Sequence, residues 1–449
     1  MAGPAIDPLR FFSPAELATW AAQARVDDWL WLSWLGLRLA FLVGVLVFGI
    51  HLALRRGIER LAGRLQPAGR GARWLRPLSR LSDPGGQRPG RWLVDALYPA
   101  ALMALWTVLA LPLAYYSSYV LGHERGLLTM GPGLWWSDWA KGLALRSLFF
   151  ALLGLGLFGL ARRLPRSWWL WLWGAVVGML LLWTMTSPLR ARVFHHFEPL
   201  PAGPTRAAVE GLMDRAGYAL EDIQLVDTSR RSHHAVAYVM GQGPTRRVVL
   251  GDNLVRRFHP REIRVALAHE LGHEQRDHRG RGLVTMALAA LLFLGLVRLL
   301  LWWAPRSRRL GLAADADPAV LPLVLLAALL LFNLNGPLSA WLDRREELEA
   351  DRAGLELTRD PVAFCSLMVR LTRTNQTDPD PPAWRQWLLA HHPSVRQRLQ
   401  FALDWAAAHD MAVDPGAIPL PSPADRGALA PGGGGVDPSG PAMPREKSG

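Results

Sequence analysis

The chain has 449 residues, of which 51% are hydrophobic and 21 are tryptophan, so it is richer in apolar side chains than most soluble proteins. Its net charge of +13 would suit a nucleic-acid-binding protein, but the arginines are spread over short loops between apolar segments, where they act as membrane-topology signals. We therefore expect a membrane protein with no nucleic-acid partner. The single cysteine, Cys365, excludes an intramolecular disulfide and a cysteine-based metal site, so any metal must be held by histidines and carboxylates.

Six apolar segments are long enough to cross the hydrocarbon core of a bilayer, which takes roughly 20 helical residues. The first four predict an N-terminal membrane domain over 1–187, and the last two interrupt the polar remainder of the chain. No cleavable signal peptide is evident, because the first apolar segment starts late and has no basic region before it. The predicted spans are 31–54, 96–119, 143–160, 168–187, 283–303 and 319–342.

Two polar segments, 188–281 and 343–410, flank the last two spans. An even number of crossings separates them, so they lie on one side of the membrane and can build one domain over 188–410. From about 411 the chain turns to Pro, Gly, Ala and Ser, and we expect a disordered tail over 411–449.

The first polar segment contains a predicted hairpin and a predicted helix. AVAYVM (235–240) and RRVVL (246–250) are rich in β-forming residues and are separated by GQGPT, a combination that predicts a β-hairpin. HPREIRVALAHELGHEQRDH (259–278) predicts a helix with Pro260 in its first turn and Glu262 near its positive end. The domain should therefore be mainly α-helical with a small β-sheet.

This predicted helix carries His269, Glu270 and His273 in the pattern His-Glu-x-x-His. Two histidines four residues apart lie on one helical face, so both imidazoles can bind one ion, while the glutamate projects toward the open side of that ion. Zinc with three protein ligands keeps a position for water, lowers the pKa of that water toward ~7 and polarises a scissile carbonyl, and the glutamate takes the proton. The pattern indicates a zinc peptidase with one Zn²⁺ per chain.

The third zinc ligand should come from another helix, and the best candidate segment is WLDRREELEADRAGLEL (341–357). Glu347 and Asp351 stand four residues apart on one face of it. One carboxylate can complete the coordination, while an acid one turn later can accept a hydrogen bond from a ligating imidazole and orient it. The alternative is an ordinary charged helix with solvated acids. The position of the segment, just after a span and on the same side as the histidines, favours the ligand.

Together these segments resemble the integral-membrane zinc endopeptidases of the gluzincin type, typified by the CAAX prenyl protease, also called the a-factor-converting endopeptidase. The resemblance extends over about 95–400 and implies an α-helical multi-pass membrane protein of about six spans with a zincin catalytic domain. It rests on LPLAYYSSYVLGHERG (111–126), RSHHAVAYVMG (231–241), HELGHEQRDH (269–278), RREELEAD (344–351) and HHPSVRQRL (391–399), which occur in order.

The resemblance also implies roles for individual residues. The zinc ligands would be His269, His273 and Glu347, with Glu270 as the general base and Asp351 as the acid that orients a ligand.

Other implied site residues flank this set. His392 and Arg398 would lie beside the zinc, where His392 could donate a hydrogen bond to the tetrahedral oxyanion. Ala237 and Tyr238 would belong to a substrate-binding edge, to which an extended peptide adds as a strand. His278 also matches a family position, but five residues after His273 it points off the ligand face of a continuous helix, so we expect a structural role.

Several positions depart from the family's pattern. Val236 stands where asparagine is usual, the loop 122–131 is altered, and Ala340 and Asp343 replace the usual Asn and Ser. These changes bear on substrate preference and leave the ligands and base intact.

Three functions remain open at this stage. The resemblance implies cleavage of membrane-associated or prenylated CAAX-type proteins. Only two of the 50 basic residues are lysines, which hints at a bacterial source and so favours a heat-shock-type quality-control protease with unprenylated substrates. The third is a membrane scaffold or transporter with a structural metal, although a glutamate at position 270 has no use in a closed structural site.

Two signals disagree on the side of the membrane. The loop 55–92 holds ten arginines against two acids, 10 − 2 = +8, and the positive-inside rule places it in the cytoplasm and the catalytic segments outside. In the eukaryotic relatives the catalytic domain faces the cytosol. We expect a multi-pass protein of a bacterial plasma membrane and slightly favour the cytoplasmic side for its catalytic domain.

Overall fold

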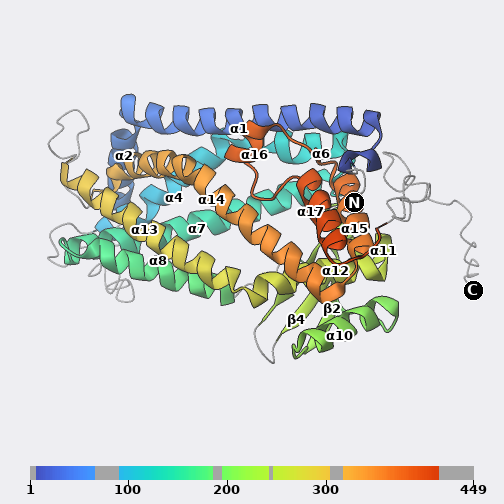
Figure 1. Ribbon diagram of the computed structural model, residues 1–449. Coiled ribbons are helices and arrows are strands. Elements are labelled where there is room, and N and C mark those ends of the chain that lie inside the picture. The colour runs from blue at the N-terminus through green and yellow to red at the C-terminus, as the bar shows by residue number, and fades with distance from the viewer. Residues whose placement is uncertain (1–6, 66–89, 186–194, 242–245, 304–316, 414–449) are drawn as a thin grey trace, which may run out of the picture.

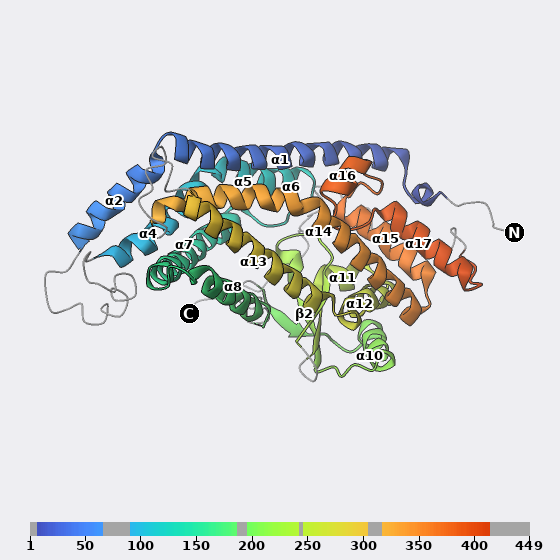
Figure 2. The same cartoon turned by 60° about the vertical axis from the view of Figure 1, so that its left-hand side comes forward.

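The computed structural model describes residues 7–65, 90–185, 195–241, 246–303 and 317–413 (Figure 1). The helices α1 and α14 extend along much of the molecule, whose one end holds the other long helices and whose other end holds a small sheet with shorter helices (Figures 1 and 2). The long helices are α1 (Pro14–Val47), α4 (Arg91–Leu109), α7 (Pro132–Arg163), α8 (Trp168–Met185), α13 (His278–Trp303) and α14 (Leu321–Thr358).

The predicted multi-pass α-helical architecture is confirmed. Within the described residues, five helices are long and apolar enough to cross a membrane, namely α1, α4, α7, α13 and α14. The helix α8 carries a shorter apolar stretch, Trp168–Leu182. The predicted span 143–160 lies in the C-terminal two thirds of α7, and the last residues of the predicted span 168–187 lie outside the described residues.

The first predicted span, 31–54, is wrong at its C-terminal end. The helix α1 ends at Val47, and Gly49 adopts a left-handed backbone conformation with φ 67°, which glycine accepts without steric cost. The chain then enters α2 (Ile50–Leu65), which carries several arginines and has one polar face. Residues 50–54 therefore belong to a second helix and not to the span.

The second predicted span, 96–119, is helical but not one continuous α-helix. The helix α4 ends at Leu109, and Pro112 lies at the start of the short α5 (Leu111–Tyr115), where its missing N–H costs no helical hydrogen bond. A π-helical turn (η3, Tyr116–Val120) and a further turn (α6, Leu121–Glu124) follow. The chain thus leaves the membrane segment through irregular turns.

The sixth predicted span, 319–342, and the candidate ligand segment 341–357 form one helix, α14. This helix bends between its two parts (Figure 2), and Pro337 within it removes a backbone hydrogen bond, which accounts for a bend. The helix predicted over 259–278 is shorter than expected. It is α12 (Pro260–Gln275), and His278 is already the first residue of α13.

The sheet has four strands in the order β1-β2-β4-β3. The predicted hairpin is confirmed, because β3 (Ala237–Met240) pairs antiparallel with β4 (Arg247–Gly251). Two strands that the sequence did not predict complete the sheet: β2 (Asp222–Val226) runs parallel to β4, and β1 (Phe197–Pro199) runs antiparallel to β2. The strand β3 is an edge strand, as a substrate-binding edge requires.

The helix α12 lies at the centre of the catalytic core. Its Ile263, Leu267 and Leu271, spaced four apart, are fully buried against the sheet and neighbouring helices. The surrounding helices are α10 (Pro204–Ala216), α11 (Asp252–Arg257), α15 (Pro361–Asn375), α16 (Ala383–Leu388) and α17 (Val395–Ala408), with 3-10 turns η1 (Pro8–Phe11), η4 (Thr228–Arg230) and η8 (Pro318–Val320).

The start of the chain packs onto this same core. Phe11, Phe12 and Trp20 belong to its buried cluster, and Arg373 of α15 forms an ion pair with Glu16 at 2.9 Å. The predicted membrane domain 1–187 therefore contributes side chains to the catalytic domain. The residues around its boundary at 187, and nearly all of the predicted tail 411–449, lie outside the described residues.

Candidate active site

Two glycines allow α12 and α14 to cross in direct backbone contact. A Cβ on Gly272 would lie 2.9 Å from the Cα and the carbonyl oxygen of Ala350, and a Cβ on Gly354 would lie 3.2 Å from the backbone nitrogen of His269. A Cβ at Gly272 would require the backbone of α14 to shift, and one at Gly354 would be tighter than ordinary van der Waals contact. Side chains within a turn of the crossing are therefore brought together from both helices.

The crossing gathers the three predicted zinc ligands. The Nε2 atoms of His269 and His273 lie 3.2 Å apart, and each lies near one oxygen of Glu347, at 3.4 Å from Oε2 and 3.5 Å from Oε1 respectively. One ligand atom from each residue lies within 4.8 Å of the others, a grouping that can hold a metal ion.

The chemistry of this cluster fits a zinc ion. Two imidazole nitrogens and one carboxylate are donors that zinc prefers, and three protein ligands leave a position for water. Oε2 of Glu347 is buried, and Nδ1 of His392 at 2.9 Å and Nε2 of His269 at 3.4 Å lie close to it. Burial lowers the pKa of the His269 imidazole, but its hydrogen bonds with Asp351 and Glu347 raise that pKa to about 9. The cluster thus favours a positive charge at its centre.

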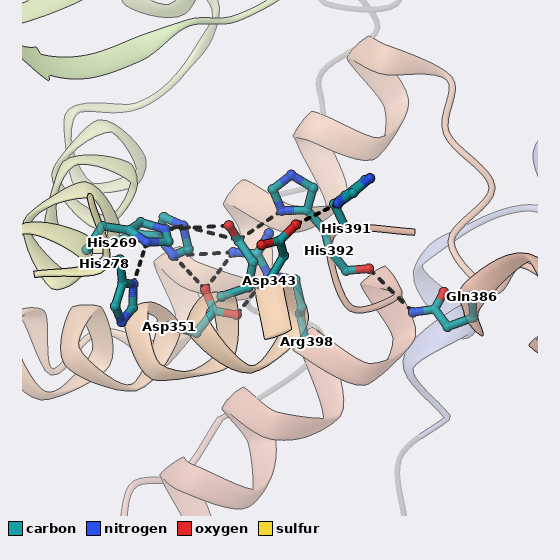
Figure 3. A network of polar contacts seen from close by, with 10 residues as sticks. His269, His278, Asp343, Asp351, Gln386, His391, His392 and Arg398 are labelled. Carbon is teal, nitrogen blue, oxygen red and sulfur yellow. Dashed lines mark hydrogen bonds and ion pairs between the residues drawn. The ribbon is translucent and has the colours of Figure 1, made fainter. Parts of the chain in front are cut away.

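Asp351 lies where the sequence predicted an orienting acid. It is fully buried, and its Oδ1 lies 2.8 Å from Nδ1 of His269. Arg398 of α17 holds the same carboxylate through both oxygens, donating from Nε at 2.8 Å and from a terminal nitrogen at 2.5 Å (Figure 3). The carboxylate therefore accepts a hydrogen bond from Nδ1–H of His269, which leaves the lone pair of Nε2 free to bind a metal.

A loop between α16 and α17 brings two more histidines to the site. Nδ1 of His392 lies 2.9 Å from Oε2 of Glu347, and its side chain is 66% exposed. Beside it, Nδ1 of His391 lies 2.6 Å from Oδ2 of Asp343 (Figure 3). Arg344 ties this loop to α14 by donating to the carbonyls of Gln386 and Ala390, both at 2.7 Å.

Sequence reasoning missed this anchoring of the loop. Asp343 was identified only as a departure from the family's usual serine, and Arg344 only as part of a sequence pattern. A carboxylate one turn before a predicted ligand, together with two consecutive histidines near a proline, was the available signal.

Glu270 is half-buried and has no hydrogen-bond or ion-pair partner among the described residues. Burial raises the pKa of its carboxyl, and the positive charges of His269 and His273 oppose that rise only in part. A carboxylate with no partner and a raised pKa, beside a metal-binding cluster, can act as a proton acceptor.

The side chains of the two residues predicted for the substrate edge lie on opposite faces of the sheet. Val236 accepts a backbone hydrogen bond from Gly251 at 2.7 Å, so in the alternating antiparallel pattern Ala237 and Val239 turn their N–H and C=O away from β4, toward the open edge. The side chain of Val239 packs in the core with α12, whereas Tyr238 packs on the opposite sheet face with Met240. Ala237 thus borders the edge, and Tyr238 does not face α12.

The close helix crossing yields a testable expectation. Gly272→Ala would force backbone atoms of α14 away from α12, so we expect a loss of about 1–3 kcal/mol of stability, typical of overpacking, together with weaker zinc binding. Gly282→Ala in α13 is the matched control, because a Cβ there meets nothing within 4 Å. Thermal unfolding and zinc content in detergent measure both effects. Unchanged values for Gly272→Ala would contradict the role of the crossing.

Comparisons with known proteins agree with this arrangement. The model of peptidase family M48 matches residues 199–406, and the model described as CAAX prenyl protease N-terminal, five membrane helices, matches residues 70–192. Among similar proteins, an uncharacterised metalloprotease of Bacillus subtilis, YhfN, is 25% identical over 403 residues, which cover 89% of this chain and 88% of that protein.

Two further similar proteins come from yeasts. CAAX prenyl protease 1 of Saccharomyces cerevisiae is 35% identical over 183 residues, covering 39% of this chain and 40% of that protein. The crystal structure of S. mikatae Ste24p matches with a TM-score of 0.62 and 21% identity, over 82% of this chain and 99% of that chain. This last match shows a shared fold.

Proposed function

Because the chain belongs to peptidase family M48, the membrane metallopeptidases typified by the CAAX prenyl proteases, we propose that it is a zinc-dependent endopeptidase that cuts membrane-associated proteins. The observation that carries the proposal is the convergence of His269, His273 and Glu347 beside the unpartnered Glu270. Five apolar helices and the matching N-terminal family model make the chain a multi-pass integral membrane protein.

The proposed mechanism assigns a proton path to this chain's own residues. A zinc ion bound by His269, His273 and Glu347 would polarise the scissile carbonyl and acidify a water. Glu270 takes a proton from the attacking water and passes it to the departing amine, a cycle that its raised pKa supports.

Asp351 and His392 support this chemistry in different ways. Asp351, held by Arg398, keeps the proton of His269 on Nδ1 throughout the cycle. His392 is exposed at the rim of the cluster and lies close to Glu347, from where it can donate a hydrogen bond to the oxyanion that forms from the carbonyl.

The substrate backbone would bind along β3. An extended peptide that adds to this edge meets the outward-facing N–H and C=O groups of Ala237 and Val239, which bind any sequence in the same way. Recognition through the backbone suits an enzyme whose substrates share an anchor and not a sequence.

An apolar cavity among the long helices favours lipid-modified substrates of the prenylated CAAX type. It has a volume of about 710 Å³ and is bordered by α1, α4, α7, α13 and α14, including Trp106, Phe293 and Phe332. Its size and apolar walls suit a bound hydrocarbon chain. Its lining residues do not include the metal-binding cluster or β3, so an isoprenoid would be bound apart from the cleaved bond.

A panel of matched peptides tests the proposed function. Purified protein loaded with zinc should cut prenylated peptides with a higher kcat/KM than the same peptides without the lipid, and chelation of the metal should stop both reactions. If only unprenylated peptides are cut, a quality-control protease replaces the CAAX assignment. If no peptide is cut while zinc is bound, the metal is structural and the chain is a scaffold or transporter.

A further inference from the structure

His278 is buried at the junction of α12 and α13. Asp277 has a φ of 48°, in the left-handed region, and its carboxylate accepts a hydrogen bond from the backbone of Gly280 at 3.1 Å. The chain therefore turns sharply after α12, and α13 begins at His278, which is 5% exposed. This turn brings the imidazole of His278 back beside His273, whereas a continuous helix would point it off the ligand face.

The imidazole of His278 links His273 to a carboxylate. Its Nδ1 lies 2.8 Å from Nδ1 of His273, and its Nε2 lies 3.3 Å from Oε2 of Glu349. An ionised carboxylate only accepts, so Nε2 of His278 carries the proton and Nδ1 is an acceptor. Nδ1 of His278 accepts a hydrogen bond from Nδ1–H of His273, and the lone pair of His273 is then at Nε2, which faces Glu347 and His269.

Each of the two ligand histidines is thus oriented by a carboxylate, one directly and the other through a second imidazole. Asp351 accepts directly from His269, while Glu349 acts on His273 through one intervening imidazole. We propose that His278 is a positioning residue that fixes the tautomer and ring orientation of His273 for the metal, with Glu349 as the acceptor that orients His278. The inference rests on the proposed function only in requiring that His273 bind the metal.

The contacts of His278 distinguish this role from direct ligation. Both of its nitrogens are engaged on the side of His273 that faces away from the cluster, so it is not a further ligand of the same ion. Glu349 is also 3.4 Å from Arg281, and its side chain is 36% exposed, whereas that of Asp351 is fully buried. Water therefore competes for the carboxylate of Glu349. Removing Glu349 should weaken zinc binding by no more than removing Asp351 does.

Zinc affinity measured without any activity assay tests the role. For purified full-length His278→Ala we expect zinc binding about 10- to 100-fold weaker than in wild type, as for other lost partners of ligand histidines. His278→Gln, whose carbonyl can still accept from His273, should recover part of the loss. Glu349→Ala should lose less, and Glu356→Ala, an exposed acid on the same helix, should match wild type.

Thermal stability of the metal-free proteins separates positioning from packing. If His278 acts by positioning, metal-free His278→Ala should unfold at nearly the same midpoint temperature as metal-free wild type. Only the rise in midpoint temperature that added zinc produces should be smaller. Wild-type zinc affinity in His278→Ala, or an equal loss of stability with and without zinc, overturns the inference. If His278→Ala does not fold, wild-type affinity in Glu349→Ala overturns it instead. Wild-type protein that binds no zinc would overturn the proposed function as well.

Discussion

Replacing Glu270 by glutamine should lower turnover by at least about 10²- to 10⁴-fold, the range typical of a lost general base, while zinc stays bound. Glutamine keeps the shape of the side chain but cannot accept a proton from the attacking water. Glu270 makes no hydrogen bond or ion pair with the other described residues, so no structural contact is lost. The measurement compares zinc content, thermal stability and peptide cleavage on the same preparations.

Glu274→Gln is the matched control for this experiment. It is the same substitution one turn later on α12, where the carboxylate pairs with Arg246 at 3.1 Å and takes no part in the metal-binding cluster. Its cleavage rate should stay close to that of wild type. Equal turnover in Glu270→Gln and wild type would remove Glu270 from the chemistry and leave the chain without an identified base.

Replacing Glu347 by alanine should weaken zinc binding by more than the about 10- to 100-fold that a lost partner of a ligand causes, because it removes a ligand itself. Two imidazoles would remain, one short of the three protein ligands of catalytic zinc sites. The effect is measured as the zinc content per chain after dialysis against a chelator and as the rate of peptide cleavage. Both the zinc content and the cleavage rate should approach zero.

Glu346→Ala provides the comparison for the ligand assignment. It changes the neighbouring acid, which points to a different side of α14 and lies outside the metal-binding cluster. Zinc content and cleavage should remain near wild type. A Glu347→Ala protein that keeps about one zinc per chain and full activity would show that the third ligand is another residue.

The parts of the fold that follow from local patterns could be predicted from the sequence. Long apolar segments indicated the membrane helices, and the spacing of His269 and His273 placed both on one helical face. The same spacing in Glu347 and Asp351 indicated a second face, and the structure brings the two faces together. Helical periodicity carries this information within one or two turns.

Features that depend on backbone turns or on distant contacts could not be predicted in this way. A single residue with positive φ, Gly49, ends the first span early, and another, Asp277, redirects His278. The strand β2 is too short to give a clear pattern, and its parallel pairing with β4 joins segments that are separated in the chain by η4 and β3. Glu349 appeared to be an ordinary solvated acid because its partner lies on another helix.

The continuity of α14 sets a distance as well as a site. The predicted span ends at 342, and 347 − 342 = 5 residues of helix, about 8 Å at 1.5 Å per residue, lead from there to Glu347. In the proposed enzyme this short helical path would keep the cleaved bond close to the end of the apolar part of α14. For a substrate anchored in the lipid, the number of residues between its anchor and that bond would then decide whether the bond reaches the site.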